Sequence, residues 1–233
     1  MTHINFYTLL QLNDATFPIG SYTLSWGLET FVQQGVIFDS ESAEAFLSGE
    51  LESNFLTNEL LPVRLSYEAF KQGAFEGLLR IDEIYNASKS AKEIREGSRK
   101  IAARFLKTAG SWHGEEKVSG PCDSSSDRYD FLKKLNHFPV VYGAFCALEE
   151  IEEDLVLQGF LYSQISARVT NAVKLVPLSQ TDGQKILHSL FEKFTVLLEE
   201  VWQLEEEDLC RAAPGSEIRG MQHEYLYTRL YMS

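Results

Sequence analysis

The side chains in this sequence that could bind a metal ion are five histidines, three cysteines and many carboxylates. A metal site built into one chain usually places two of its ligands at a short, fixed spacing. The histidines form no HxH, HxxxH or His–Cys pair of that kind; they are His3, His113, His137, His188 and His223. We therefore expect no high-affinity metal site within the chain. A metal site whose ligands come from several chains remains an alternative.

Motifs for nucleotide binding and nucleophilic catalysis are also missing from the sequence. It contains no GxxxxGK[ST] phosphate loop, no GxGxxG after a strand and no GxSxG turn. Its two carboxylate-rich segments are Glu149–Asp154 and Glu199–Asp208; runs of acids are usually solvated faces, and Glu205–Asp208 is typical of one. We expect no enzymatic activity from this chain alone. The alternative, an enzyme with an acidic cleft, would need converging carboxylates with shifted pKa values.

Charge and composition limit the partners and the compartment. With 34 acidic and 21 basic residues the formal net charge is −13, which argues against nucleic acid and anionic membranes as main partners. No apolar run of about 18 residues predicts a membrane span, and no secretory signal is recognisable. The three cysteines are far apart and odd in number, which favours reduced thiols. We expect a cytoplasmic protein.

The stretch 9–35, LLQLNDATFPIGSYTLSWGLETFVQQG, is the most distinctive part of the chain. Pro18 and Gly20 interrupt its apolar run, because proline lacks an N–H and glycine accepts positive φ. Ser21 and Thr23 are suitable N-cap residues for a helix that restarts directly after them. The residues alone predict a corner between two helices.

Helical spacing of apolar residues continues through almost the whole chain, without a convincing β-strand pattern. Ser90 and Glu93 predict a capping box at the start of one helix. The longest helix is expected from Asp154 to a break before Pro177. We predict an all-α fold of roughly ten helices in a single compact domain, residues 1–233. The Gly- and Ser-rich loop 110–127 could link two domains, but the helical patterns on either side are too short for two cores.

The C-terminal residues 214–233 are predicted to act as a docking tail. They follow a Pro-Gly-Ser break, yet they contain tyrosine, leucine and methionine side chains that a disordered tail would lack. Tyrosine and arginine are frequent anchors of protein interfaces. The tail could dock on its own domain, on a partner chain, or on both.

Three stretches, spread over nearly the whole chain, resemble the signatures of the UreF family of urease accessory proteins. The first is LNDATFPIGSYTLSWGLE near the N-terminus; the second is NAVKLVPLSQTDGQKIL from Asn171, and the third is the end, MQHEYLYTRLYMS, from Met221. They occur in the family's order, and none is a generic nucleotide or metal motif. The segment from Glu93 to Ser98 resembles a further family segment only loosely, because Gly97 replaces an acidic residue.

The resemblance implies a non-enzymatic, all-α, homodimeric protein. Such proteins are adaptors between a UreH/UreD-type accessory protein and the GTPase UreG during GTP-dependent nickel insertion into apo-urease. Nickel and GTP would then be handled by the complex, and this chain would need no cofactor of its own. A general helical interaction protein with another client is the alternative function.

The resemblance also implies partner-binding residues. Tyr22 and Arg229 match family positions linked to recruiting the GTPase, and we expect the two ends of the chain to meet there. Lys174 matches a basic family position and is a second candidate for the same face. Tyr162 is a candidate contact for the UreH-type partner. The tail residues His223 and Glu224 complete the set of partner-binding candidates.

Overall fold

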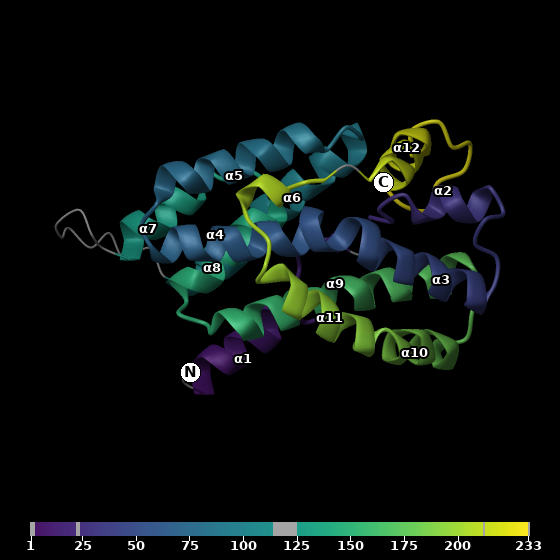
Figure 1. Cartoon of the computed structure of the whole chain (residues 1–233), viewed down its shortest axis with the longest axis horizontal. Helices are drawn as coiled ribbons and strands as arrows, with labels where there is room; N and C mark the ends of the chain where they lie inside the picture. The colour runs from purple at the N-terminus through teal and green to yellow at the C-terminus, as the bar shows by residue number, and fades with distance from the viewer. Residues whose placement is uncertain (1–2, 22–23, 114–124, 212, 233) are drawn as a thin grey trace.

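The computed structural model describes residues 3–21, 24–113, 125–211 and 213–232, and its regular elements are helices (Figure 1). No β-strand occurs among these residues, so the predicted all-α fold class is confirmed. The helices are α1 (His3–Leu12), α2 (Leu28–Gln33), α3 (Ser40–Glu50), η2 (Leu51–Leu60), α4 (Leu61–Lys71), α5 (Phe75–Ser88), α6 (Lys92–Ala109), η3 (Gly110–His113), α7 (Ser125–Leu132), α8 (Phe138–Leu148), α9 (Glu153–Leu175), α10 (Gln180–Ser189), α11 (Phe191–Val201), η4 (Glu206–Asp208) and α12 (Pro214–His223).

Helix α8 is the centre of the apolar core. All its residues from Phe138 to Ala147 are buried, as expected for a helix that is apolar on every side. Gly143 lets α8 approach α4 closely, because a Cβ at this position would lie 2.2 Å from the carbonyl oxygen of Val63. Phe105 of α6 contacts the ring of Phe145 edge-on, with 5.2 Å between ring centroids. The core is therefore built by close helix packing and interlocking aromatic rings.

Helices α3, η2 and α4 follow one another without a loop, and η2 is a π-helix. Pro62, in the first turn of α4, has no N–H to continue an α-helical hydrogen-bond pattern into the preceding turn. Carbonyl groups of η2 are then available to other partners: the Thr57 oxygen accepts a hydrogen bond from the Cys210 N–H at 3.0 Å. The side chain of Asn58 also donates to the Arg211 oxygen at 2.9 Å. The π-helix thus holds the loop that leads into α12.

Two predictions about where helices begin are wrong. The helix after the Pro18 break begins at Leu28 rather than directly after Thr23, because Trp26 (φ 56°) and Gly27 (φ 85°) adopt left-handed backbone conformations. The capping box predicted at Ser90 is also absent from the described structure. Helix α6 begins after Ala91 without a side-chain cap, and the Ser90 N–H donates to Glu217 of α12 at 2.9 Å.

Among the described helices, none combines the length and the apolar composition that crossing a bilayer would require.

Candidate partner-docking site

The C-terminal segment, which we define as residues 214–232, docks on α2 and on the beginning of α6 (Figure 1). The Thr30 hydroxyl on α2 donates to the Arg219 carbonyl oxygen of α12 at 3.0 Å. Gly220 permits a close approach to α6, because a Cβ there would lie 2.5 Å from Cδ1 of Ile94. Of the two docking modes predicted for the tail, docking on its own chain is the one this structure contains.

Glu29 is the buried acceptor that fixes the end of the segment. Its side chain is only 2 % exposed. Its carboxylate accepts from Nε2 of His223 at 3.0 Å and from the backbone N–H groups of Leu230 at 2.7 Å and Tyr231 at 3.1 Å. A buried carboxylate is stable only when such donors replace its water shell. The last residues of the chain are therefore fastened to α2 by their backbone.

His223, at the end of α12, lies between two carboxylates and is 0 % exposed. Nδ1 is 2.7 Å from Glu93 Oε2, and Nε2 is 3.0 Å from Glu29 Oε2. Each ring nitrogen therefore has a carboxylate oxygen as its hydrogen-bond partner. The resulting trio of Glu29, Glu93 and His223, which we call the His223 cluster, joins α2, α6 and α12.

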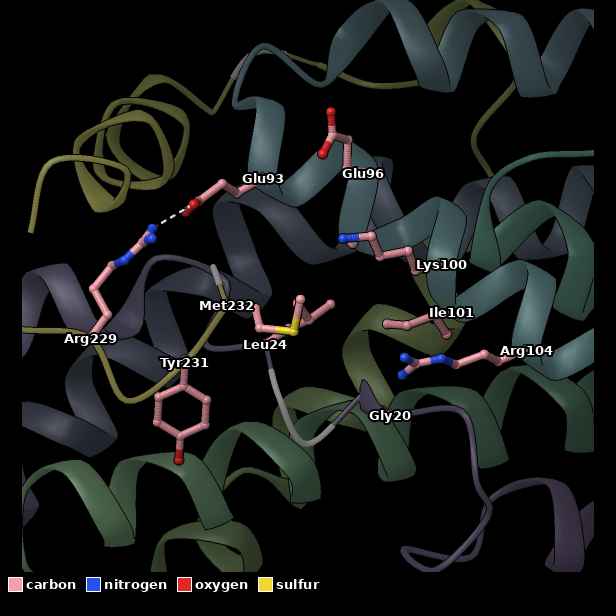
Figure 2. A pocket seen from close by; sticks show the side chains of 11 residues that line it. Gly20, Leu24, Glu93, Glu96, Lys100, Ile101, Arg104, Arg229, Tyr231 and Met232 are labelled. Carbon is pink, nitrogen blue, oxygen red and sulfur yellow. Dashed lines mark hydrogen bonds and ion pairs between the residues drawn. The ribbon is translucent and has the colours of Figure 1, made fainter.

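Arg229 extends this cluster to the surface. Its Nη1 donates to Glu93 Oε1 at 2.6 Å, and its side chain is 39 % exposed (Figure 2). Because both oxygens of Glu93 are engaged, by His223 and by Arg229, the carboxylate orients the guanidinium. The exposed part of Arg229 is held in a defined position at the surface.

A cavity of about 360 Å³ lies beside Arg229 (Figure 2). Gly20, Leu24, α6 and the C-terminal segment surround it; the lining residues are Gly20, Leu24, Glu93, Glu96, Gly97, Lys100, Ile101, Arg104, Arg229, Tyr231 and Met232. Gly20 belongs to the first of the three signature stretches and Arg229 to the last. Residues from the two ends of the chain therefore line one cavity.

Comparison with known proteins gives the family. The UreF family pattern matches residues 37–191. A urease accessory protein UreF from Actinobacillus pleuropneumoniae serotype 5b is 37 % identical over 225 residues, which cover 97 % of each chain. The chain belongs to the UreF family. The Haemophilus influenzae strain 86-028NP UreF is 36 % identical over 97 % of this chain and 94 % of its own. The UreF of Bacillus sp. strain TB-90 is 32 % identical over 97 % and 98 %.

The structure places the partner-binding candidates implied by the UreF resemblance in different surroundings. Arg229 lines the cavity, whereas Tyr22 lies outside the described residues, so their pairing stays a prediction. His223 is buried and positions Arg229 through Glu93. Glu224 follows it and is exposed.

The two candidates on α9 do not line this cavity. Lys174 is exposed in the last turn of α9, where a positive charge is favourable. Tyr162 is 47 % exposed, and its ring centroid lies 6.4 Å from that of Phe191 on α11. The structure therefore brings Gly20 and Arg229 together, but it does not join Lys174 or Tyr162 to them.

Sequence reasoning missed Glu29, Lys100 and Arg104, and it assigned Glu93 to a cap. Glu29 is an acid among apolar residues of a family signature, and this isolated charge is the signal that could have marked it as buried and paired. For Lys100 and Arg104 the only signal is their spacing of four residues on one helix.

Buried ionisable groups also pair outside this site, as Lys89 does with Glu59 at 3.3 Å. Within the residues that the structure describes, no group of three or more His, Cys, Asp or Glu side chains is arranged to hold a metal ion. Burial, with the charge of Glu68 as the next cause, raises the pKa of Glu153 to about 7. Glu153 is not among the residues that line the cavity beside Arg229.

Proposed function

We propose that this UreF-family protein is a non-enzymatic adaptor in urease maturation. It would bridge a UreH/UreD-type accessory protein and the GTPase UreG, and the assembly would deliver nickel to apo-urease at the expense of GTP. Nickel would pass through the complex as cargo and GTP would be bound by the GTPase. This chain would contribute surfaces, and as a homodimer it would contribute each of them twice.

The observation that carries the proposal is the position of Arg229. The family resemblance links this arginine and Tyr22 to the GTPase, and Gly20, two residues before Tyr22, lines the same cavity as Arg229. The guanidinium is half-exposed and oriented by a carboxylate, which is the arrangement of an interface anchor. A partner that contacts Arg229 would therefore meet a preorganised side chain.

The exposed apolar side chains of the C-terminal segment support the same function. Tyr225, Tyr227, Leu230 and Met232 are all at least half exposed, although the backbone N–H groups of Leu230 and Tyr231 fasten the same segment to Glu29 of α2. Large apolar side chains displayed on an ordered segment are typical of protein interaction sites. Docking on its own chain thus leaves the outer face of the segment for a partner.

Co-purification tests the proposal. The full chain would be tagged and mixed with UreH/UreD-type and UreG-type proteins, and activation of apo-urease with nickel and GTP would be measured in parallel. We expect capture of both partners by the unchanged chain. Arg229→Ala should weaken GTPase capture by about thirtyfold, the effect of a single interface anchor, and leave the UreH-type protein bound.

Arg211→Ala is the matched control, since Arg211 is also an exposed arginine that pairs with an acid, Asp208. It should leave both partners bound. Capture of neither partner by the unchanged chain would reject the adaptor function in favour of a protein with another client. Unchanged capture of the GTPase by Arg229→Ala would remove Arg229 from the interface.

A further inference from the structure

The cavity beside Arg229 contains two cations whose charges are not neutralised within the described chain. Lys100 and Arg104 lie four residues apart on α6, both are exposed, and neither forms an ion pair or hydrogen bond with another described residue. Figure 2 shows both side chains extending toward the cavity. Residues at this spacing lie on the same face of a helix, so the two charges act on one region.

The acidic residues of the cavity do not cancel these two charges. Glu93 is already occupied by His223 and Arg229. Glu96 also lines the cavity, but Figure 2 shows its carboxylate pointing away from Nζ of Lys100. The chain has a net charge of −13, but Lys100 and Arg104, which have no ion-pair partner among the described residues, make this cavity locally attractive to an anion.

The absence of a side chain at Gly20 leaves space for the guanidinium of Arg104. A Cβ at position 20 would lie 2.1 Å from Nη1 of Arg104, closer than atoms can approach. The backbone of Gly20 also has φ +78°, a conformation that favours glycine. The signature turn around Pro18 and Gly20 therefore leaves the guanidinium of Arg104 against the backbone at one wall of the cavity.

The remaining wall is apolar and belongs partly to the proposed docking surface. Leu24 and Ile101 are buried, and Met232 is half-exposed at the end of the C-terminal segment. A volume of about 360 Å³ is enough for side chains to enter. The cavity thus combines an apolar wall with two cations, which suits a side chain with an apolar stem and an anionic end.

We propose that this cavity receives an acidic side chain of the protein that docks on the C-terminal segment, and that Lys100 and Arg104 pair with its carboxylate. The proposal rests on the function above, in which that protein is the GTPase. A protein carboxylate is favoured over a free anion because Arg229 and Met232 line the cavity and also belong to the proposed docking surface. One partner can therefore cover the segment and fill the cavity together.

Binding of the GTPase to the full chain, measured at low and at high salt, tests this inference. The double variant Lys100→Ala/Arg104→Ala should bind about tenfold more weakly at low salt, as expected for the loss of two partly exposed ion pairs. Its affinity should also depend less on salt than that of the unchanged chain. The charge reversal Lys100→Glu/Arg104→Glu should weaken binding further, and an Asp→Lys or Glu→Lys change at the contacting position of the GTPase should restore it.

Lys92→Ala/Lys107→Ala is the matched control, since both lysines are exposed on α6 and do not line this cavity. It should bind like the unchanged chain.

If Lys100→Ala/Arg104→Ala also binds like the unchanged chain while Arg229→Ala does not, the inference is wrong and the adaptor function stands. If the unchanged chain binds no GTPase, both fail. Binding of inorganic phosphate that requires Lys100 and Arg104 and leaves GTPase affinity unaltered would assign the cavity to a small anion and overturn the proposal.

Discussion

The core around α8 and the C-terminal segment are held in place by different forces. Helix α8 is buried among apolar side chains, whose attraction has no preferred direction and is shared by many contacts. The C-terminal segment is fastened by a few directional hydrogen bonds to Glu29 and Glu93. We expect loss of one such bond to release the segment, and loss of core packing to destabilise the whole fold. The second arrangement suits a surface that binds partners.

Two buried histidines express this difference. His137, next to α8, and His223 are both 0 % exposed. His137 faces the neutral oxygens of Ser98 and Asn86, and burial, followed by the charge of Arg99, lowers its pKa to about 3. His223 instead faces two carboxylates. The core surrounds its histidine with neutral oxygens, and the C-terminal segment places its histidine between two carboxyl groups.

Phe105→Ala should have the largest effect on stability. The ring is fully buried and contacts four aromatic rings of the core: Phe17, Phe138, Tyr142 and Phe145. Removing it leaves a cavity that close-packed helices cannot fill, so the free energy of unfolding should fall by about 3–5 kcal/mol. Chemical denaturation measures this. Tyr227→Ala, at a fully exposed tyrosine of the C-terminal segment, should change it by less than about 0.5 kcal/mol. Equal effects would abolish the distinction between the two regions.

His223→Ala should release the C-terminal segment without unfolding the core. It leaves the buried Glu29 carboxylate with one hydrogen-bond partner fewer, which would cost about 1.5–3 kcal/mol if the site stayed closed. Opening the segment to water avoids most of that cost, so we expect the global free energy of unfolding to fall by only about 1–2 kcal/mol. Hydrogen exchange should show the Leu230 and Tyr231 amides losing protection while amides of α8 keep theirs.

Glu224→Ala, one residue further along and exposed, is the control for this variant and should leave the exchange pattern unchanged. Retained protection of Leu230 and Tyr231 in His223→Ala would mean that Glu29 holds the backbone unaided. A loss of protection throughout α8 would mean that the segment is part of the cooperative core.

The sequence predicts the core better than the site, because core helices follow from local patterns. The long helix expected from Asp154 to the break before Pro177 is α9, Glu153–Leu175. The capping box at Ser90 and Glu93 fails because partners more than 120 residues away, Glu217 and His223, compete for the same groups. No local pattern contains such partners. The meeting of the two chain ends was expected only from the family resemblance, and its Tyr22 component is still a prediction.

Glu29 and Glu153 differ in whether their buried carboxylate oxygens have hydrogen-bond partners. Glu29 of the His223 cluster has hydrogen-bond donors on both carboxylate oxygens. Glu153, at the start of α9, has one buried oxygen without a hydrogen-bond partner in the described structure. Burial and the neighbouring charge of Glu68 therefore raise the pKa of Glu153 from its ordinary 4.5 to about 7. The buried carboxylate of Glu29 is therefore hydrogen-bonded on both oxygens, whereas Glu153 at the start of α9 keeps one buried oxygen without a partner in the described structure.

Glu153→Gln should give the smallest effect and one that depends on pH. A carboxyl group whose pKa is raised on folding binds more protons in the folded than in the unfolded state between pH 4.5 and about 7. Its contribution to stability is therefore complete below pH 4.5 and is lost as the pH rises through 7. Glutamine resembles the protonated form, so the free energy of unfolding of the variant should equal that of the unchanged chain at pH 4 and exceed it at pH 8. The increase should be only about 1 kcal/mol, because solvent screens this half-buried group. Denaturation at the two pH values measures the difference.

Glu152→Gln, at the neighbouring exposed acid, should lack this pH dependence. A Glu153→Gln variant that is less stable at pH 8 would show that the carboxylate is satisfied as Glu29 is, and the contrast between the two glutamates would not hold.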